Sequence, residues 1–349
     1  MDPLKSLVIT PEVLRLVAEI DEFKGQWKAL GQLAPDRLTA LRRVATIESV
    51  GSSTRIEGAQ LTDVEIDALL AGLDIKSFRT RDEQEVAGYA EVMELCFGSF
   101  AEMSLTENHI KQLHGMLLKH SDKDERHRGS YKTLPNSVEA FDADGKSVGI
   151  IFKTVSPFDT PRLMESLVVW TRAALDTEKS YHSLLVIAAF TVRFLAIHPF
   201  QDGNGRLSRI LTTLLLLRAG YDYVPYSSLE RVVEDNKDHY YRALRRAQTT
   251  LDKDESGLGE WVLFFLQCLV TQKSSLAAKV ERERLIGRLP ELSEKLLHIV
   301  RDHGRVTVAT GVKLTGANRN TVKVHLRLLV SAGRLEQHGR GKGTWYALR

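Results

Sequence analysis

Residues 198–209 bring together side chains that could bind and process a phosphate compound. They read His-Pro-Phe-Gln-Asp-Gly-Asn-Gly-Arg-Leu-Ser-Arg. An unperturbed histidine has a pKa of about 6.5, so His198 is a candidate general base at neutral pH. Because the residue before a proline is pushed out of the helical region, a helix is expected to end here. The two glycines let backbone N–H groups approach a ligand, and a helix that starts beside them attracts anions.

Two arginines and one aspartate of this stretch favour a phosphate ligand. Arg206 and Arg209 are three residues apart and share one face of the expected helix. A cation at a helix N-terminus is unfavourable by about 0.3–1 kcal/mol unless an anion binds there, and arginine holds phosphate with two hydrogen bonds. Asp202 is a natural ligand for Mg²⁺, which takes one or two carboxylates together with phosphate oxygens. A helix terminator, a glycine turn or a solvated arginine would each be ordinary alone; together in one corner they favour a site.

The same stretch resembles the signature of the Fic (Fic/DOC) family, His-Pro-Phe-x-(Asp/Glu)-Gly-Asn-Gly-Arg-x-x-Arg, at every defined position. The resemblance implies a protein adenylyltransferase that moves AMP from ATP to a Ser, Thr or Tyr hydroxyl and releases pyrophosphate. It implies that His198 is the base, that Asp202 holds Mg²⁺ and that Phe200 is buried. It places the β-phosphate on Arg206 and the γ-phosphate on Arg209. The residues that would bind ATP are Gly203, Asn204, Gly205, Arg206, Leu207, Ser208 and Arg209.

Two further segments resemble parts of this family. A β-prone run after several turn residues predicts a hairpin, in the place where the family carries a flap that aligns the target chain. The flap residues would be Gly149, Ile150, Ile151 and Phe152. Tyr240 and Tyr241 match aromatic residues near the adenine, although Gln248 stands where relatives carry asparagine. An ordinary surface hairpin and ordinary helix packing are the alternatives.

A candidate inhibitory segment, called the brake below, lies far upstream of His198. Ser53, Glu57 and Gly58 fit the pattern (Ser/Thr)-x-x-x-Glu-(Gly/Asn), which in the Fic family marks an inhibitory helix. The resemblance implies that Glu57 pairs with Arg209 and prevents productive placement of the γ-phosphate. The same glutamate could instead position a water that removes AMP, so a deAMPylating activity is left open.

Helical periodicity dominates the chain and predicts a mainly α fold. Its parts would be a Fic-type helical core, a small β-hairpin flap and a C-terminal winged-helix-like domain. The predicted boundaries are 1–100 for an N-terminal helical region with the inhibitory motif, 101–275 for the catalytic core, 276–289 for a connecting helix and 290–349 for the last domain. Helices are expected over residues 11–30, 35–47, 62–73, 81–100, 161–175, 181–197, 204–219, 258–273 and 276–289.

The last sixty residues are basic. Residues 290–349 hold eleven Lys/Arg and four Asp/Glu, a net charge of +7, while the whole chain carries +3. Three short helices followed by two strands resemble a winged helix, whose third helix would enter the major groove of DNA. The candidate contacts are Arg319, Asn320, Thr321, Lys323 and Arg327. Such modules also dock proteins or form dimers, so both partners are left open.

The composition favours a cytoplasmic protein without a membrane span. The two cysteines, Cys96 and Cys268, form no disulfide framework, and no apolar run is long enough to cross a bilayer. Two functional alternatives stand beside the adenylyltransferase. One is a DNA-binding transcriptional regulator whose Fic-like core senses a nucleotide, and the other is a Fic-type transferase with another nucleotide donor. A homodimer and self-modification are also compatible with the sequence.

Overall fold

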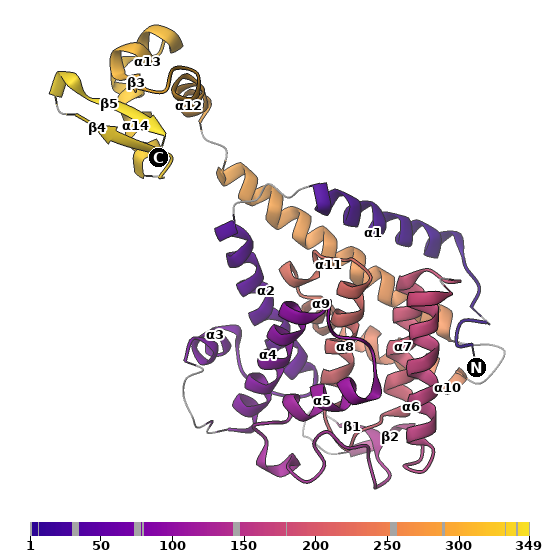
Figure 1. Ribbon diagram of the computed structural model, residues 1–349. Coiled ribbons are helices and arrows are strands. Elements are labelled where there is room, and N and C mark those ends of the chain that lie inside the picture. The colour runs from indigo at the N-terminus through magenta and orange to yellow at the C-terminus, as the bar shows by residue number, and fades with distance from the viewer. Residues whose placement is uncertain are drawn as a thin grey trace. The chain divides into compact units, whose positions relative to one another are not determined.

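Helices make up most of the computed structural model, which confirms the predicted fold class (Figure 1). The structure describes residues 2–5, 7–29, 35–72, 78, 80–141, 147–178, 180–251, 257–287, 290–331, 333–339 and 341–348. The chain divides into two compact units, Met1–Ala277 and Ala278–Arg349. The helices of the first unit are α1 (Pro11–Ala29), α2 (Pro35–Ile56), α3 (Asp63–Ala71), α4 (Arg81–Ser99), α5 (Glu107–Leu117), α6 (Thr160–Arg172), α7 (Ser183–Ile197), α8 (Asn204–Arg218), α9 (Leu229–Asp235), α10 (Lys237–Thr250) and most of α11 (Leu258–Gly287).

Side-chain caps start several of these helices. Thr62 and Thr80 each form a capping box, and the Oγ1 of Thr106 accepts a hydrogen bond from the N–H of His109. The far end of α8 closes as the sequence predicts, with Gly220 at a positive φ of 82°. These local signals set where the helices begin and end, and tertiary packing then decides their arrangement.

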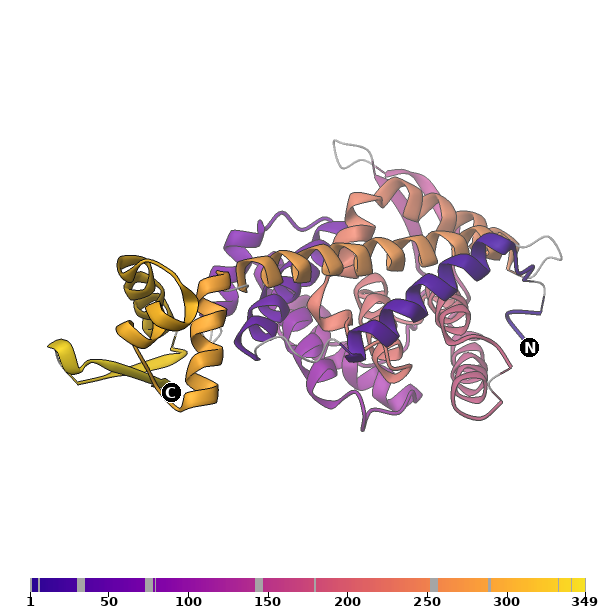
Figure 2. The same cartoon turned by 90° about the horizontal axis from the view of Figure 1, so that it is seen from above.

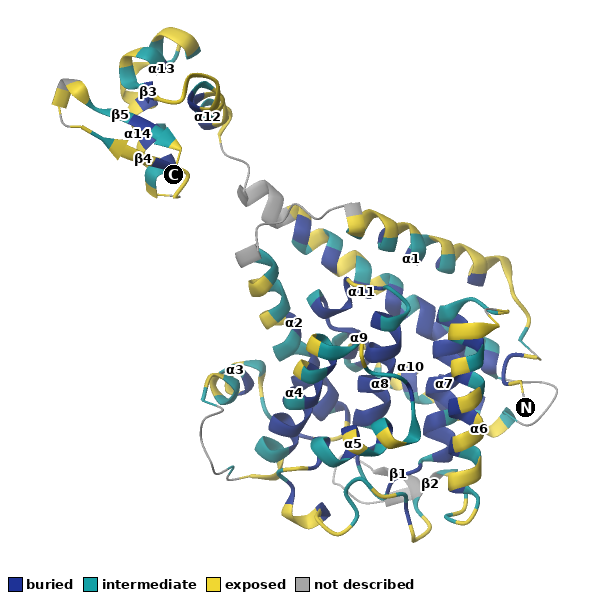
Figure 3. Ribbon diagram, viewed as in Figure 1, coloured by how far each residue is buried: buried dark blue, intermediate teal, exposed yellow. Residues whose placement is uncertain are grey.

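Two buried helices, α7 and α8, form the centre of the first unit. Nearly every residue of both is buried, as the dark ribbons of Figure 3 show. The helix α6 packs against α7, while α4 and α5 pack against α8. The tight corner between α7 and α8 is therefore held from several sides, and it contains residues 198–203.

Two helices differ from the expected ranges. The predicted helix 35–47 continues to Ile56, because α2 packs against α4 and α9 and residues 49–54 are buried. The predicted helices 258–273 and 276–289 form one continuous helix, α11, as far as Gly287. Figures 1 and 2 both show α1 beside α11, where Lys273 Nζ lies 2.8 Å from Glu19 Oε1.

The expected hairpin is present. Strand β1 (Ser137–Phe141) pairs antiparallel with β2 (Ser147–Lys153), and Ala140 lies opposite Gly149. The register shifts twice along the pair, which is typical of a bulged hairpin. The two strands thus form a separate small sheet beside the helices.

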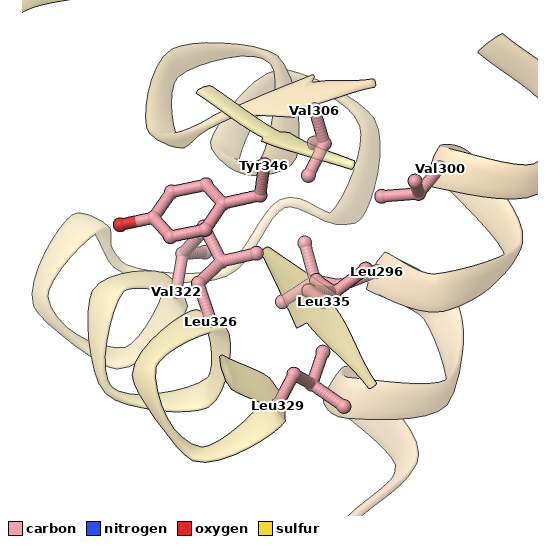
Figure 4. Close-up of a cluster of buried hydrophobic side chains, with 8 residues drawn as sticks. All are labelled: Leu296, Val300, Val306, Val322, Leu326, Leu329, Leu335 and Tyr346. Atoms are coloured by element: carbon pink, nitrogen blue, oxygen red, sulfur yellow. The ribbon is translucent and has the colours of Figure 1, made fainter. Parts of the chain in front are cut away.

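The second unit is a small three-helix and three-strand fold. It contains α12 (Glu291–His303), β3 (Val306–Thr307), α13 (Val308–Thr315), α14 (Arg319–Ser331), β4 (Leu335–His338) and β5 (Trp345–Leu348). The strands are antiparallel in the order β3-β5-β4. Figure 4 shows its core, made of Leu296, Val300, Val306, Val322, Leu326, Leu329, Leu335 and Tyr346. Strand β3 was not expected from the sequence, and the winged-helix assignment of this unit stays a prediction.

The length and apolar character of the described helices decide whether any of them could span a bilayer. Within the ranges given above, none is both long enough and apolar enough to cross a membrane.

Candidate active site

His198 sits in a strained backbone conformation at the corner between α7 and α8. Its φ is 52° and its ψ is 61°, and among the described residues it is the one non-glycine with a positive φ. This left-handed conformation costs about 1–3 kcal/mol for most residues, and it is kept where the surroundings impose it. Pro199 contributes locally, because it excludes the helical conformation for the residue before it.

The side chain of His198 is a neutral imidazole. Burial lowers its pKa to about 4, and the Lys132 ammonium acts in the same direction against Glu57 and Asp202. The Nδ1 atom lies 3.3 Å from the carbonyl oxygen of Leu195. Since a carbonyl only accepts hydrogen bonds, Nδ1 carries the proton and Nε2 keeps a lone pair that can accept one. The histidine is thus ready to act as a base at neutral pH.

The predicted burial of Phe200 is confirmed. Its ring has no exposed surface and stacks on the imidazole of His114, with ring centroids 3.8 Å apart. Its backbone is fixed by Asn204, whose Oδ1 accepts from Phe200 N–H at 2.9 Å and whose Nδ2 donates to the Phe200 carbonyl at 2.7 Å. Asn204 therefore braces the corner from the first turn of α8.

The corner is also fixed on the side of Asp202. The Nδ1 of His114 accepts from the N–H of Gly129 at 2.8 Å, so its Nε2–H donates to the Asp202 carbonyl at 3.0 Å. Gly203 then turns the chain into α8 with a φ of 76°, a conformation that suits glycine. As a result, the first N–H groups of α8 are presented to the pocket beside His198.

The carboxylate of Asp202 contacts three positively polarised groups, with which a metal ion would compete for its oxygens. Its Oδ1 accepts from Gly203 N–H at 2.6 Å, and its Oδ2 accepts from Arg81 Nη2 at 3.0 Å. Arg206 Nη2 lies 3.4 Å from the same Oδ1. Burial raises the pKa of Asp202, but these neighbours outweigh it and lower the pKa below its ordinary value. The carboxylate is therefore ionised, as a metal ligand must be.

The two arginines of the motif are buried and already paired. Arg206 is 2% exposed, and its Nη1 lies 3.0 Å from Glu85 Oε2. Its Nε and Nη1 are buried and have no hydrogen-bond partner among the described atoms, so the contact with Glu85 is an ion pair rather than a hydrogen bond. Arg209 donates from Nε to Ser53 Oγ at 2.8 Å and from Nη2 to the Ser53 carbonyl at 2.9 Å.

The predicted pair between Glu57 and Arg209 is present in the structure. Arg209 Nη2 donates to Glu57 Oε1 at 2.8 Å. Burial raises the pKa of Glu57, but Arg209 and Arg206 lower it more strongly, so the net pKa is depressed. The carboxylate lies directly over the N-terminus of α8, because a Cβ on Gly205 would be 2.1 Å from Glu57 Oε1. Gly58 follows with a φ of 107°, which lets the chain turn away after α2.

One pocket joins the catalytic corner to the predicted adenine side. It is lined by Glu57, Leu195, His198, Gln201, Asp202, Gly203, Asn204, Gly205, Tyr240, Tyr241, Leu244, Arg245 and Gln248. Both tyrosines of the prediction come from α10, and Gln248 lies on the same helix two turns later. The residue that departs from the expected asparagine thus still faces the same pocket.

Comparison with known proteins gives a consistent result. Residues 104–216 match the model of the Fic/DOC family. The chain thus carries the motif of residues 198–209 inside a region that is similar to this family. It is 26% identical over 265 residues to the protein adenylyltransferase Fic of Drosophila grimshawi, covering 75% of this chain and 49% of that protein. The chain thus spans about half the length of that curated relative.

Two solved structures share the fold. A Fic family protein from Desulfovibrio desulfuricans G20 superimposes with a TM-score of 0.65 and 23% identity, covering 100% of this chain and 98% of that one. A Fic domain containing signaling protein from Bacteroides thetaiotaomicron VPI-5482 gives a TM-score of 0.59 and 25% identity, covering 74% and 96%.

The other residues predicted for the Fic site, for the flap and for DNA binding lie in different parts of the structure. Leu207 is fully buried, and the Oγ of Ser208 donates to the Gly205 carbonyl at 2.7 Å, so both side chains serve the helix. Gly149, Ile150, Ile151 and Phe152 all lie in β2, as the predicted hairpin requires. The five candidate DNA contacts are exposed on α14, in the second unit.

Three charged residues around the Fic motif were missed in the sequence. Arg81 and Glu85 extend from α4 to Asp202 and Arg206, and Lys132 contacts the corner from the segment before β1. Their partners are between 65 and 121 residues away in the chain. A single sequence carries no local signal for such pairs, and only the spacing of Arg81 and Glu85, four apart, indicates that those two interact.

Proposed function

We propose that this chain is a protein adenylyltransferase that transfers AMP from ATP to a hydroxyl group of a protein. The observation that carries the proposal is one pocket lined by a neutral His198, the N-terminus of α8 and the carboxylate of Asp202. Arg206 and Arg209 extend from the first turns of the same helix. Similarity to proteins named adenylyltransferase Fic supports this reaction over transfer from another donor.

In the proposed reaction, Nε2 of His198 accepts the proton of the target hydroxyl while the hydroxyl oxygen attacks the α-phosphorus of ATP. The bond from that phosphorus to the bridging oxygen of the β-phosphate breaks, so pyrophosphate leaves and AMP stays on the target. N–H groups at the start of α8 stabilise the charge that develops on the phosphate oxygens. Arg206 binds the β-phosphate and Arg209 the γ-phosphate.

The residues near Asp202 fit Mg²⁺. They offer one carboxylate beside the proposed phosphates, which is the donor set this ion prefers. Among the described residues there is no group of three or more His, Cys, Asp or Glu that could hold a metal ion alone, so phosphate and water would supply the other ligands. Bound there, Mg²⁺ would neutralise phosphate charge.

We propose that the structure represents an inhibited state of this site, in which Glu57 prevents productive nucleotide binding. Glu57 occupies Arg209 and lies over Gly205, where the triphosphate would bind. Its helix is anchored, because Arg55 donates from Nε to Glu234 Oε1 at 2.6 Å and from Nη2 to Oε2 at 3.1 Å. Release would therefore require a change at the end of α2 or at its contact with α9.

The target would be recognised beside the hairpin. Strand β2 pairs with β1 along one edge, and an extended target segment would add to its other edge by main-chain hydrogen bonds. The adenine would lie against Tyr240 and Tyr241, with Gln248 as its polar contact. A reducing compartment such as the cytoplasm suits the two buried free cysteines.

Intact-mass spectrometry tests the proposal. Wild type, Glu57→Gly and Glu57→Gly/His198→Ala would each be incubated with Mg²⁺ and ATP, alone and with a cell extract as the source of targets. We expect AMP-sized adducts with Glu57→Gly, few with wild type and none without His198. Adducts that persist in the double variant, or ATP that binds to none of the three proteins, would refute the proposed chemistry.

We also propose that the second unit binds duplex DNA. Arg319, Lys323 and Arg327 follow one another at intervals of four along α14 and are exposed, as are Asn320 and Thr321 on the same helix. The net charge of +7 over residues 290–349 favours a polyanion. The regulator alternative thus becomes an added property of the same chain.

Fluorescence anisotropy of the full chain with a labelled mixed-sequence duplex tests DNA binding. Lys323→Ala should weaken binding and reduce the dependence on salt by about one counterion, whereas Lys295→Ala on α12 is the matched control. If the duplex does not bind and the chain instead dimerises with concentration, α14 is a protein-docking surface. Its exposed Val324 and Leu328 would then provide the contact.

A further inference from the structure

Lys132 is a buried cation that neither phosphate binding nor the brake accounts for. It is 3% exposed, and its Nζ donates to Asn136 Oδ1 at 2.9 Å, to Thr154 Oγ1 at 3.0 Å and to the Ile197 carbonyl at 3.0 Å. All three acceptors are neutral, and no carboxylate within the described part of the chain forms an ion pair with it. A buried charge without a counter-ion is costly, so its position calls for a specific reason.

One reason for the position of Lys132 is that its ammonium binds the C-terminal end of α7. Ile197 is the last residue of that helix, and its carbonyl is one of those that a helix leaves without an internal partner. A cation is favoured there by the negative end of the helix dipole. The backbone N–H of Lys132 also donates to the Pro199 carbonyl at 2.8 Å. One residue thus holds the carbonyl before His198 and the carbonyl after it.

The other reason for the position of Lys132 is that its ammonium also binds the β1–β2 hairpin. Asn136 directly precedes β1 and Thr154 directly follows β2, so the ammonium bonds to both ends of the β-hairpin. Asn136 extends this link, because its Nδ2 donates to the Phe200 carbonyl at 2.8 Å. Thr154 Oγ1 also donates to the Asn136 carbonyl at 2.6 Å. The predicted target-binding strand and the catalytic corner therefore share one buried hydrogen-bond network.

We propose that Lys132 is a positioning residue, which holds His198 in its left-handed conformation and fixes it relative to the β1–β2 hairpin. The inference rests on the proposed role of His198 as the base. It adds that pairing of a target with β2 and placement of the base are coupled through the hydrogen-bond network centred on Lys132. A misplacement of about 1 Å at a reacting group can cost on the order of 100-fold in rate, so such coupling would matter for catalysis.

The electrostatics of the site agree with this geometry. Burial lowers the pKa of Lys132 to about 8, so the ammonium remains largely charged at neutral pH. Burial is also the main cause of the low pKa of His198, and the Lys132 charge lowers it further. Glu57 and Asp202 face the same imidazole and raise its pKa. Lys132 thus helps to keep the base neutral as well as in place.

The test uses the full chain in the Glu57→Gly background, with Lys132→Met as the first variant. Methionine keeps much of the length of lysine and removes the charge and the three hydrogen bonds. The matched control is Thr171→Val, which removes a buried hydroxyl that donates to the Leu167 carbonyl within α6. Thr154→Val keeps the ammonium but removes its link after β2, and Lys132→Gln serves if the methionine variant does not fold.

Two readouts are measured on each variant. The pKa of His198 comes from ¹H–¹⁵N spectra of the imidazole, assigned by the signal that disappears in His198→Ala. The kcat and the KM for ATP come from adduct formation. For Lys132→Met we expect the pKa of His198 to rise and kcat to fall 10- to 100-fold, while KM changes less than about threefold. For Thr154→Val we expect a loss in kcat with the pKa of His198 unchanged.

The outcomes separate this inference from the proposed function. If Lys132→Met behaves like Thr171→Val in both readouts, Lys132 does not position His198. If Thr154→Val alone matches the control, the link to the hairpin is wrong. If no variant forms an adduct, the reaction itself is in question, and the pKa of His198 still decides whether Lys132 acts on it.

Discussion

Replacing Glu57 by glutamine isolates the charge of the side chain that we propose to be inhibitory. The substitution keeps its shape, so its contact over Gly205 remains, where the carboxylate oxygen now lies 2.1 Å from the place of a Cβ. Arg209 also keeps both hydrogen bonds to Ser53. What changes is the charge-assisted bond from Arg209 Nη2 to Glu57 Oε1, 2.8 Å long.

The size of the effect follows from competition for Arg209. A hydrogen bond to a charged group contributes about 1.5–3 kcal/mol, and a γ-phosphate must displace this one to reach the guanidinium. The Glu57 side chain is 34% exposed, so solvent screening favours the lower end of that range. A difference of about 1.4 kcal/mol is tenfold in affinity. We therefore expect Glu57→Gln to bind ATP about tenfold more tightly than wild type, and Glu57→Gly at least as tightly, since it also clears the space over Gly205.

Isothermal titration calorimetry with a non-hydrolysable ATP analogue and Mg²⁺ measures this difference. AMP provides the internal control, because it has no γ-phosphate to compete with Glu57 for Arg209. Its affinity should be nearly equal in wild type and Glu57→Gln. Equal affinities for the ATP analogue in all three proteins would refute competition at Arg209. An equal gain for AMP and the analogue would show that Glu57 blocks the pocket in another way.

Three further predictions concern the surroundings of the motif. Arg81→Gln should lower the Mg²⁺ concentration needed for nucleotide binding two- to fivefold, since a half-exposed pair with Asp202 contributes about 0.2–1 kcal/mol. A Mg²⁺ titration of fluorescent nucleotide binding measures this change, with Arg15→Gln as the control. The pKa of Glu57 is depressed below its ordinary value of 4.5 in the folded protein. Its pairing therefore stabilises the fold at pH values above 4.5, and this contribution is lost as the pH falls through the pKa of the folded state. Urea unfolding should therefore show wild type and Glu57→Gln converging in stability at acid pH, and a constant gap would contradict the pairing. Phe200→Ala should cost about 3–5 kcal/mol of unfolding free energy because the ring is fully buried, and a loss below 1 kcal/mol would mean that the corner does not depend on it.

Local chemistry in the sequence was sufficient to predict the corner between α7 and α8. A proline after His198, a left-handed Gly203 and a polar first turn specify the end of one helix and the start of the next, whatever surrounds them. The same holds for the helices that begin at a threonine cap. Family resemblance then supplied the pair between Glu57 and Arg209, which no local rule connects, and the structure confirms that they meet.

Tertiary contacts decided what the sequence left open. The second half of α2 contains Gly51, Ser52, Ser53 and Thr54, which are poor helix formers, and the periodicity weakens there. These four residues are nevertheless buried, because α2 packs between α4 and α9, and burial overrides their intrinsic preference. Glu57 directly follows the end of this helix, so the proposed brake depends on contacts that local propensity does not describe.

The charges around the motif bear on the stability of the proposed inhibited state and on what its activation would require. Each charged side chain of the motif has a partner of opposite sign from the N-terminal helices: Arg209 with Glu57, Arg206 with Glu85 and Asp202 with Arg81. The six charges of these pairs cancel, so the pairs themselves add little attraction for an anion. Removal of Glu57 leaves a net positive charge beside the open N-terminus of α8, and this favours a metal-bound triphosphate, which is anionic. Nucleotide and metal would then compete with Glu85 for Arg206 and with Arg81 for Asp202. On this view Glu57 decides whether nucleotide binding begins, while Arg81 and Glu85 affect how tightly metal and phosphate bind once it has begun.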